Sequence, residues 1–184
     1  QTEKSKVTTS RKLHQYMLQA KQYSQGRYSI NMAEDYVHGN VSIPNRDRED
    51  IRKRNWAAAM AGAYTMVLGM EIQNTPESWL KDCRTLQKFM ESTHYNCLVP
   101  HDNLAGDNTD YVLANKPYDY ILYSSQTKNS LDMKHMEDGS YSLRWLDCIS
   151  GKQKFIERKH LSHERASFSV PEEFGKEVAL YIER

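Results

Sequence analysis

The spacing of apolar residues changes near Asn96, and this change divides the chain. Before Asn96, apolar positions recur three and four residues apart in three stretches, which is the period of an amphipathic helix. After it, apolar and polar positions alternate, and turn residues recur at regular intervals. The pattern predicts a mixture of helices and strands over residues 1–95 and an all-β module over residues 96–184.

Three helices are predicted in the first part. Ser10 would cap the first helix, and Gly26 would end it. The second helix would begin at Asn45. Its first part is charged, and it is rich in alanine after Trp56. Because its basic residues alternate with acidic ones, we interpret the charged stretch as a solvated face rather than an anion-binding site. The third would have Thr75 as its N-cap and bury one face, made of Trp79, Leu80, Cys83, Leu86, Phe89 and Met90.

Two predicted strands separate these helices. Tyr28–Ala33 is a short apolar run. Ala63–Met70 is apolar at both odd and even positions, which is typical of a parallel strand buried on both faces. Two β/α units cannot close a barrel or cover both faces of a parallel sheet. We therefore expect further strands, upstream of Gln1 or on another chain, and we interpret residues 1–95 as the end of a larger α/β domain.

The second part carries regularly spaced strand patterns, which predict an antiparallel β-sandwich. We interpret most of its aromatic residues as core, although sugar-binding modules also stack such rings against sugars. The candidate strands are Asp110–Ala114, Tyr118–Ser124, Ser140–Leu146, Gln153–Arg158, Arg165–Val170 and Glu177–Ile182. The aromatic residues are Tyr111, Tyr118, Tyr120, Tyr123, Tyr141, Trp145 and Phe155.

Composition narrows the classes of function. The chain has 184 residues, of which 39% are hydrophobic and 27% charged, so it should bury a core. A net charge of +1 argues against a nucleic-acid-binding surface. No apolar run approaches the ~20 residues of a membrane helix, and the polar start has no signal-peptide pattern. Three cysteines without metal-ligand spacing predict free, buried or half-buried thiols.

The candidate chemistry lies where the Tyr28–Ala33 strand ends, because Glu34 and Asp35 follow it directly. A strand, then a carboxylate, a loop and a helix is the order in which β/α barrels present catalytic groups. An acid on a surface loop is the alternative. Asp35 has the opposite parity, so in a regular strand only one of the two acids faces the barrel axis, unless a bulge exchanges them. Tyr36 and His38 are candidates for the pocket wall.

Several segments resemble a known pair of domains. Asn31–Glu34 and Asn55–Thr65 resemble the last two strand segments of apiosidase-like glycoside hydrolase barrels. The second part resembles the β-domain that follows such barrels, named the collagen-binding domain of a collagenase; the name does not establish collagen as a ligand. The matching segments there are Leu98–Leu104, Asp110–Ala114, Tyr118–Tyr123, Arg144–Asp147 and Ser150–Lys152.

The resemblance implies the last two β/α units of a (β/α)8 barrel followed by a β-sandwich. It implies a carbohydrate substrate, no cofactor and a secreted or periplasmic protein. Glycoside hydrolysis uses two carboxylates; Glu34 would be the nucleophile, and the acid/base would come from an earlier strand outside this chain. A Glu34–Glu71 pair is sterically allowed, but a solvated loop or substrate-rim role for Glu71 is the simpler interpretation.

No motif indicates a metal, since His160 and His163 have only loose ligand spacing and no companion. The alternative function is not enzymatic. In that reading the β-module binds a ligand or has a structural role, and the barrel remnant is an inactive scaffold. The missing acid/base favours this alternative for the chain taken alone.

Overall fold

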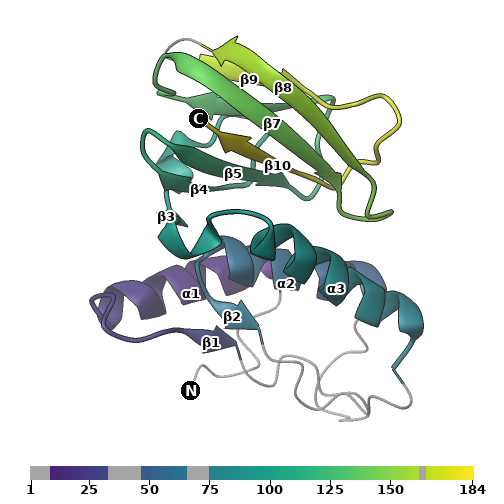
Figure 1. The fold of residues 1–184 in the computed structure, drawn as a ribbon. Coiled ribbons are helices and arrows are strands. Elements are labelled where there is room, and N and C mark those ends of the chain that lie inside the picture. Colours follow the sequence, from purple (N-terminus) through teal and green to yellow (C-terminus); the bar gives the residue numbers. More distant parts are fainter. Residues whose placement is uncertain (1–8, 33–46, 66–74, 162–164) are drawn as a thin grey trace. The chain divides into compact units, whose positions relative to one another are not determined.

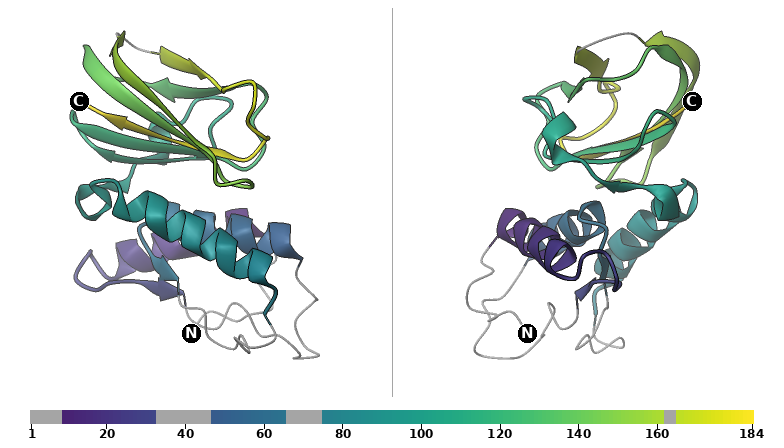
Figure 2. Two further views of the ribbon diagram at one scale, coloured as in Figure 1. Left: turned by 45° about the vertical axis from the view of Figure 1, so that its right-hand side comes forward. Right: turned by 90° about the vertical axis from the view of Figure 1, so that its left-hand side faces the viewer.

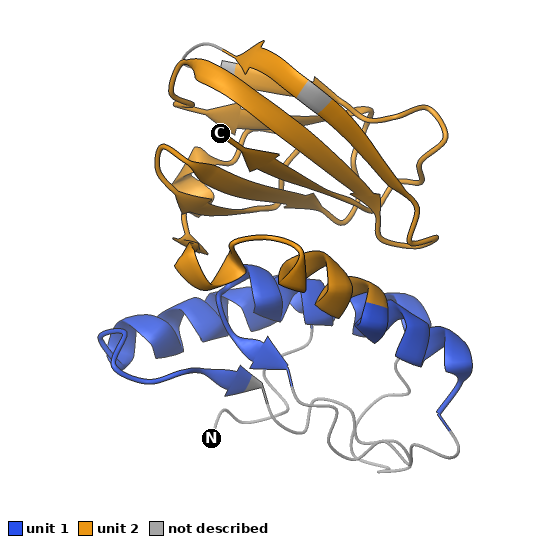
Figure 3. Ribbon diagram, viewed as in Figure 1, with its two compact units in different colours: residues 1–84 blue, residues 85–184 orange. Residues whose placement is uncertain are grey.

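A computed structural model of the chain describes residues 9–32, 47–65, 75–161 and 165–184 (Figure 1). The chain forms two compact units, Gln1–Arg84 and Thr85–Arg184 (Figure 3). The division expected from the sequence lies at 95/96. The boundary between these two compact units falls within one helix, Glu77–Glu91, whose second half belongs to the second unit.

Three helices are present where the sequence predicts them: α1 (Ser10–Tyr23), α2 (Arg48–Met60) and α3 (Glu77–Glu91). Thr9 rather than Ser10 caps α1, since the Thr9 hydroxyl accepts a hydrogen bond from the Lys12 amide at 3.2 Å. Asp47 caps α2 by accepting the Asp50 amide at 2.7 Å. Both helices end near a glycine, Gly26 and Gly62, at φ +69°, a conformation that glycine adopts without steric cost.

Two short strands lie between the helices, β1 (Asn31–Met32) and β2 (Tyr64–Thr65), side by side in Figure 1. They pair in parallel, Asn31 with Tyr64 and Met32 with Thr65, and α2 connects them. The predicted strands were longer; residues 33 and 66–70 of those predictions lie outside the described residues. The apolar core of this unit combines Leu13, Met17, Ile51, Ala58, Ala61 and Ala63.

The charged start of α2 is not simply a solvated face, so that expectation is wrong for two of its residues. Arg52 and Arg54 are 5% and 0% exposed. Arg48 donates twice to the carboxylate of Asp82 on α3, at 2.7 Å each, and Arg52 lies 3.4 Å from the same carboxylate. The sequence did not reveal this burial because the partner acid lies on another helix.

The second unit is antiparallel β-structure. Its larger sheet has the strand order β3-β4-β5-β10-β7-β8, and β6 pairs with β9 in a second sheet. The strands are β3 (Val99–Pro100), β4 (Tyr111–Asn115), β5 (Asp119–Ser124), β6 (Ser130–Lys134), β7 (Gly139–Asp147), β8 (Gln153–Leu161), β9 (Arg165–Ser169) and β10 (Val178–Glu183). All six predicted strands are confirmed within a few residues, whereas β3 and β6 were not predicted.

One apolar core joins the two sheets of this unit. Val112, Trp145 and Leu180 contribute to it from the six-stranded sheet, and Met133 and Phe168 from the pair β6–β9. Figure 2 shows this unit in two further views. The interpretation of the aromatic residues as core is confirmed for Tyr111, Tyr120, Tyr123, Tyr141 and Trp145. It is wrong for two of them, since Tyr118 is 58% and Phe155 55% exposed.

The cysteines are free thiols: Cys148 is buried and Cys83 half-buried, but Cys97 is exposed, contrary to expectation. Burial raises the pKa of the Cys83 thiol. None of the helices that the structure describes combines the length and the apolar character that crossing a bilayer requires.

Candidate functional site

The residues predicted for the site follow, in the sequence, two strands whose carboxyl ends lie at the same edge. Because β1 and β2 run in parallel, their last residues, Met32 and Thr65, lie at the same edge of this small sheet. The Tyr64 amide donates to the Ile30 carbonyl at 2.8 Å and extends this pairing. The chain therefore has, in its first unit, the strand–helix–strand arrangement that brings the ends of successive strands together.

The residues predicted for the site lie just beyond these ends. Glu34 is two residues after Met32, and Glu71 is six residues after Thr65. Glu34, Asp35, Tyr36, His38 and Glu71 all lie outside the described residues, so their roles remain predictions.

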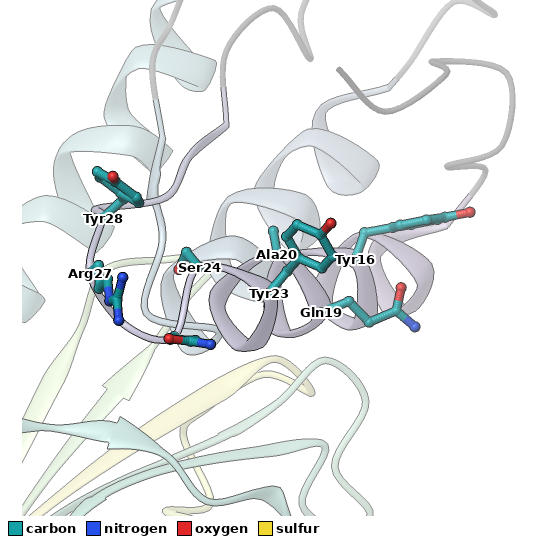
Figure 4. Close-up of a pocket in the computed structure, with 8 residues that line it drawn as sticks. Tyr16, Gln19, Ala20, Tyr23, Ser24, Arg27 and Tyr28 are labelled. Atoms are coloured by element: carbon teal, nitrogen blue, oxygen red, sulfur yellow. The ribbon is translucent and has the colours of Figure 1, made fainter.

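The first unit contains a pocket of about 650 Å³ between the end of α1 and the segment leading to β1 (Figure 4). Tyr16, Gln19, Ala20 and Tyr23 line it from α1, and Ser24, Gln25, Arg27 and Tyr28 from the segment that follows. Tyr23 and Tyr28 are 94% and 73% exposed. These residues precede β1 in the chain, whereas Glu34 follows it. The sequence did not indicate this pocket as part of a site.

The second unit holds a group of polar side chains that we call the His94 cluster: His94, Asp119, Tyr181 and Glu183. His94 Nδ1 lies 3.2 Å from Asp119 Oδ2 and 3.9 Å from Glu183 Oε1. The Tyr181 hydroxyl donates to Asp119 Oδ1 at 3.0 Å and lies 3.3 Å from His94 Nδ1. Asp119 and Tyr181 are buried, whereas the His94 side chain is 60% exposed.

The surroundings of Tyr181 in the cluster change its pKa. Burial, followed by the charge of Asp119 and the hydrogen bond to it, raises the pKa of Tyr181 well above its ordinary value. The phenol therefore stays protonated at neutral pH and remains a donor. Arg144 on β7 lies over the Tyr181 ring, 5.7 Å from its centroid, and donates to the backbone oxygen and hydroxyl of Ser92.

Sequence reasoning missed this cluster because its members are far apart in the chain. Asp119 and Glu183 are cross-strand partners in the pairing of β5 with β10, and His94 lies in the turn after α3. Two acids in separate strands become neighbours only through strand register. The sequence offered one signal, since Tyr181 lies in the predicted strand Glu177–Ile182 and Glu183 follows two residues later, so an extended strand places both on the same face.

A second buried carboxylate has a structural environment. Asp147, at the end of β7, accepts the amides of Ile149, Ser150 and Gly175 at 2.8, 3.1 and 3.0 Å. Burial alone would raise its pKa, but the hydrogen bonds outweigh burial, and the pKa of Asp147 is lowered. These partners are backbone amides of the segments that follow β7 and precede β10, so we interpret Asp147 as a residue that holds a turn together.

The fold of this chain is similar to that of solved glycoside hydrolases. No protein-family model matches the sequence. No curated protein matches it either. Similarity is found among solved structures, and it extends over both units of the chain.

One similar structure is a glycoside hydrolase family 5 protein from Bacteroides vulgatus ATCC 8482, with a TM-score of 0.63 and 14% identity. It covers 92% of this chain, and this chain covers 45% of it. Another, a glycoside hydrolase, has a TM-score of 0.60 and 14% identity, with coverages of 90% and 45%. The chain thus spans about half the length of these glycoside hydrolases, and identity this low supports the fold alone.

Proposed function

We propose that this chain is the carboxyl-terminal part of a glycoside hydrolase acting on a poly- or oligosaccharide. The observation that carries the proposal is the parallel pairing of β1 with β2 across α2, in a chain whose fold is glycoside-hydrolase-like. This pairing is the repeating unit of a β/α barrel, and barrel enzymes carry their catalytic groups after the carboxyl ends of the strands. Glu34 follows such an end by two residues.

In the proposed site Glu34 is the nucleophile of a retaining mechanism. Its carboxylate attacks the anomeric carbon while an acid protonates the leaving oxygen, and water then releases the glycosyl group. The acid lies on an earlier barrel strand outside this chain, at ~5–5.5 Å from the nucleophile. Asp35, Tyr36 and His38 border the sugar, and Glu71 lies at the rim of the cleft. The reaction needs no cofactor.

The family in this proposal is the apiosidase-like group, with residues 1–95 as the last two β/α units of its barrel. Residues 96–184 are then the sandwich that follows, the module named for collagen binding. The antiparallel sheets and the buried Trp145 support this assignment, and so do the resembling segments Arg144–Asp147 and Ser150–Lys152.

The test uses the whole protein with its preceding barrel strands. Glu34→Gln keeps the size of the side chain but removes the nucleophile, so turnover should fall by several orders of magnitude, beyond the ~10²–10⁴ of one acid–base group. Glu71→Gln is the matched control and should cost far less. A 2-fluoro-glycoside substrate should label Glu34 covalently, as seen by peptide mass spectrometry. Near-normal hydrolysis by Glu34→Gln would show that the assignment is wrong.

A second candidate function, a non-catalytic binding module, is favoured by the two exposed aromatic side chains of the second unit. Tyr118 and Phe155 keep more than half of their surface in water, and such rings stack on sugar faces. If the module binds polysaccharide, Tyr118→Ala and Phe155→Ala should weaken retention of the chain in affinity electrophoresis. Tyr23→Ala, which removes an exposed ring from the first unit, should not.

A further inference from the structure

We propose that His94, Asp119 and Glu183 bind a divalent transition-metal cation, with zinc as the best match. This site is independent of the proposed hydrolase function, because it lies on the six-stranded sheet of the second unit and uses none of the candidate catalytic residues. Each of the three side chains offers one ligand atom, and these atoms lie within 4.8 Å of one another.

The distances suit a small ion. Zinc binds histidine nitrogen and carboxylate oxygen at ~2.0–2.2 Å in tetrahedral geometry, which places neighbouring donor atoms about 3.3 Å apart. His94 Nδ1 and Asp119 Oδ2 are already 3.2 Å apart, and Glu183 Oε1 is 3.9 Å from the same nitrogen. Glu183 is the last residue of β10 and its side chain is 38% exposed, so a small rotation brings it into range.

The protein holds these ligands in position, as it does in preorganised metal sites. Asp119 and Glu183 are cross-strand partners, so the sheet fixes their spacing. Tyr181 donates to Asp119 Oδ1 and leaves Oδ2 directed at His94, which is how outer hydrogen bonds orient a ligating carboxylate. Tyr181 is itself 2% exposed and held under Arg144. The orientation of the buried carboxylate is therefore established before any ion binds.

The charge of the group also favours a cation. Like charges directly opposite on neighbouring strands repel, and Asp119 is buried beside Glu183. The nearby Arg144 donates to Ser92 rather than to either carboxylate. A bound dication would offset the repulsion between the two acids.

The ligand set decides the kind of ion. One imidazole nitrogen with two carboxylate oxygens suits zinc and similar transition metals, whereas calcium takes six to eight oxygens and magnesium keeps several waters. The exposed side of His94 leaves a coordination position for water. We expect the ion to connect the turn after α3 to the ends of β5 and β10.

The experiment is calorimetric titration of the metal-free chain with zinc chloride, with cobalt(II) absorption as a second readout. We expect one saturable equivalent and a tetrahedral cobalt spectrum. His94→Ala and Glu183→Gln should each weaken binding at least tenfold, since metal affinity falls 10–100-fold even when an outer partner is lost. His160→Ala and Glu172→Gln, which change exposed residues of the same unit outside the cluster, should bind as the parent does.

Asp119→Asn needs a separate check of folding, because it removes a buried charge that Tyr181 and His94 contact. Its folding is checked by circular dichroism. If it does not fold, the test rests on the variants His94→Ala and Glu183→Gln. Zinc binding that survives both His94→Ala and Glu183→Gln would overturn the proposal. The absence of saturable binding would also overturn it, and the cluster would then be a histidine–carboxylate contact without a metal. Loss of binding in His160→Ala alone would overturn it as well.

Discussion

Tyr120 and Tyr181 lie on the adjacent strands β5 and β10, and both are almost fully buried. The two tyrosines differ in whether the hydroxyl group has a hydrogen-bond partner. The Tyr181 hydroxyl donates to Asp119, whereas the Tyr120 hydroxyl has no hydrogen-bond partner among the described residues. Burial raises the pKa of Tyr120 to about 12. A buried hydroxyl without a partner loses its hydration and gains little in return.

We expect opposite effects when each hydroxyl is removed. Tyr120→Phe should leave the free energy of unfolding unchanged or raise it by about 1 kcal/mol, because a buried unsatisfied group costs ~1–3 kcal/mol. Tyr181→Phe should lower it by about 1–3 kcal/mol, because a bond to a charged acceptor is lost. Urea denaturation with a chelator present measures both without interference from metal. The opposite order of stabilities would contradict this reading.

Asp147 should make the turn after β7 sensitive to acid. Its pKa is lower in the folded state than in the unfolded chain, so its contribution is complete above the unfolded value and is lost as the pH falls through the folded value. Asp147→Asn should therefore reduce the free energy of unfolding by about 1–3 kcal/mol at neutral pH. The difference from the parent should shrink below about pH 4.

Denaturation at several pH values measures this effect. Glu172→Gln, on an exposed residue, is the control and should follow the parent. A difference between Asp147→Asn and the parent that stays constant down to pH 3 would show that the carboxylate charge has no part in the turn.

At the scale of elements, one acid joins two helices. Asp82 on α3 is 6% exposed and faces both Arg48 and Arg52 of α2. Breaking a buried ion pair at one partner is strongly destabilising because the remaining charge stays desolvated. Asp82→Ala should lower the free energy of unfolding by about 3 kcal/mol. Thermal and urea unfolding of the chain measure the loss.

The matched control removes an exposed pair from α2. Lys53 contacts Glu49 one turn away, and the Glu49 side chain is 62% exposed. Glu49→Gln should cost less than about 1 kcal/mol, as is usual for surface ion pairs. Equal losses in Asp82→Ala and Glu49→Gln would mean that the buried contact does not connect α2 to α3.

Elements were predictable where they are long and periodic. The three helices and six of the strands of the second unit follow from the spacing of apolar residues and from the turn residues between them. β3 has only two residues, and β6 (Ser130–Lys134) begins and ends with polar residues. Asp132 of β6 is buried, and its carboxylate accepts hydrogen bonds from the side chains of Asn108 and Ser167. A short or polar strand has no period to detect, and its partners are distant in the chain.

At the scale of the whole molecule, the first unit should associate when the chain is alone. In the described residues β2 pairs only with β1, although the Ala63–Met70 segment is apolar on both parities. Tyr23, Tyr28 and Tyr64 also expose large apolar surfaces there. We expect light scattering to show dimers or larger species, which added upstream barrel residues should suppress. A well-behaved monomer that unfolds cooperatively would contradict this expectation.

The sequence alone determined the change from helical to alternating period, the position of the helices, the glycines that end α1 and α2, and the placement of a carboxylate after a strand. These are local properties, because period, capping and turn residues act within a few positions. The tertiary structure decided which strands pair, that Arg52 and Arg54 are buried, and that His94, Asp119 and Glu183 meet. Strand register and helix packing bring together residues up to 89 positions apart, and no spacing along the chain encodes that proximity.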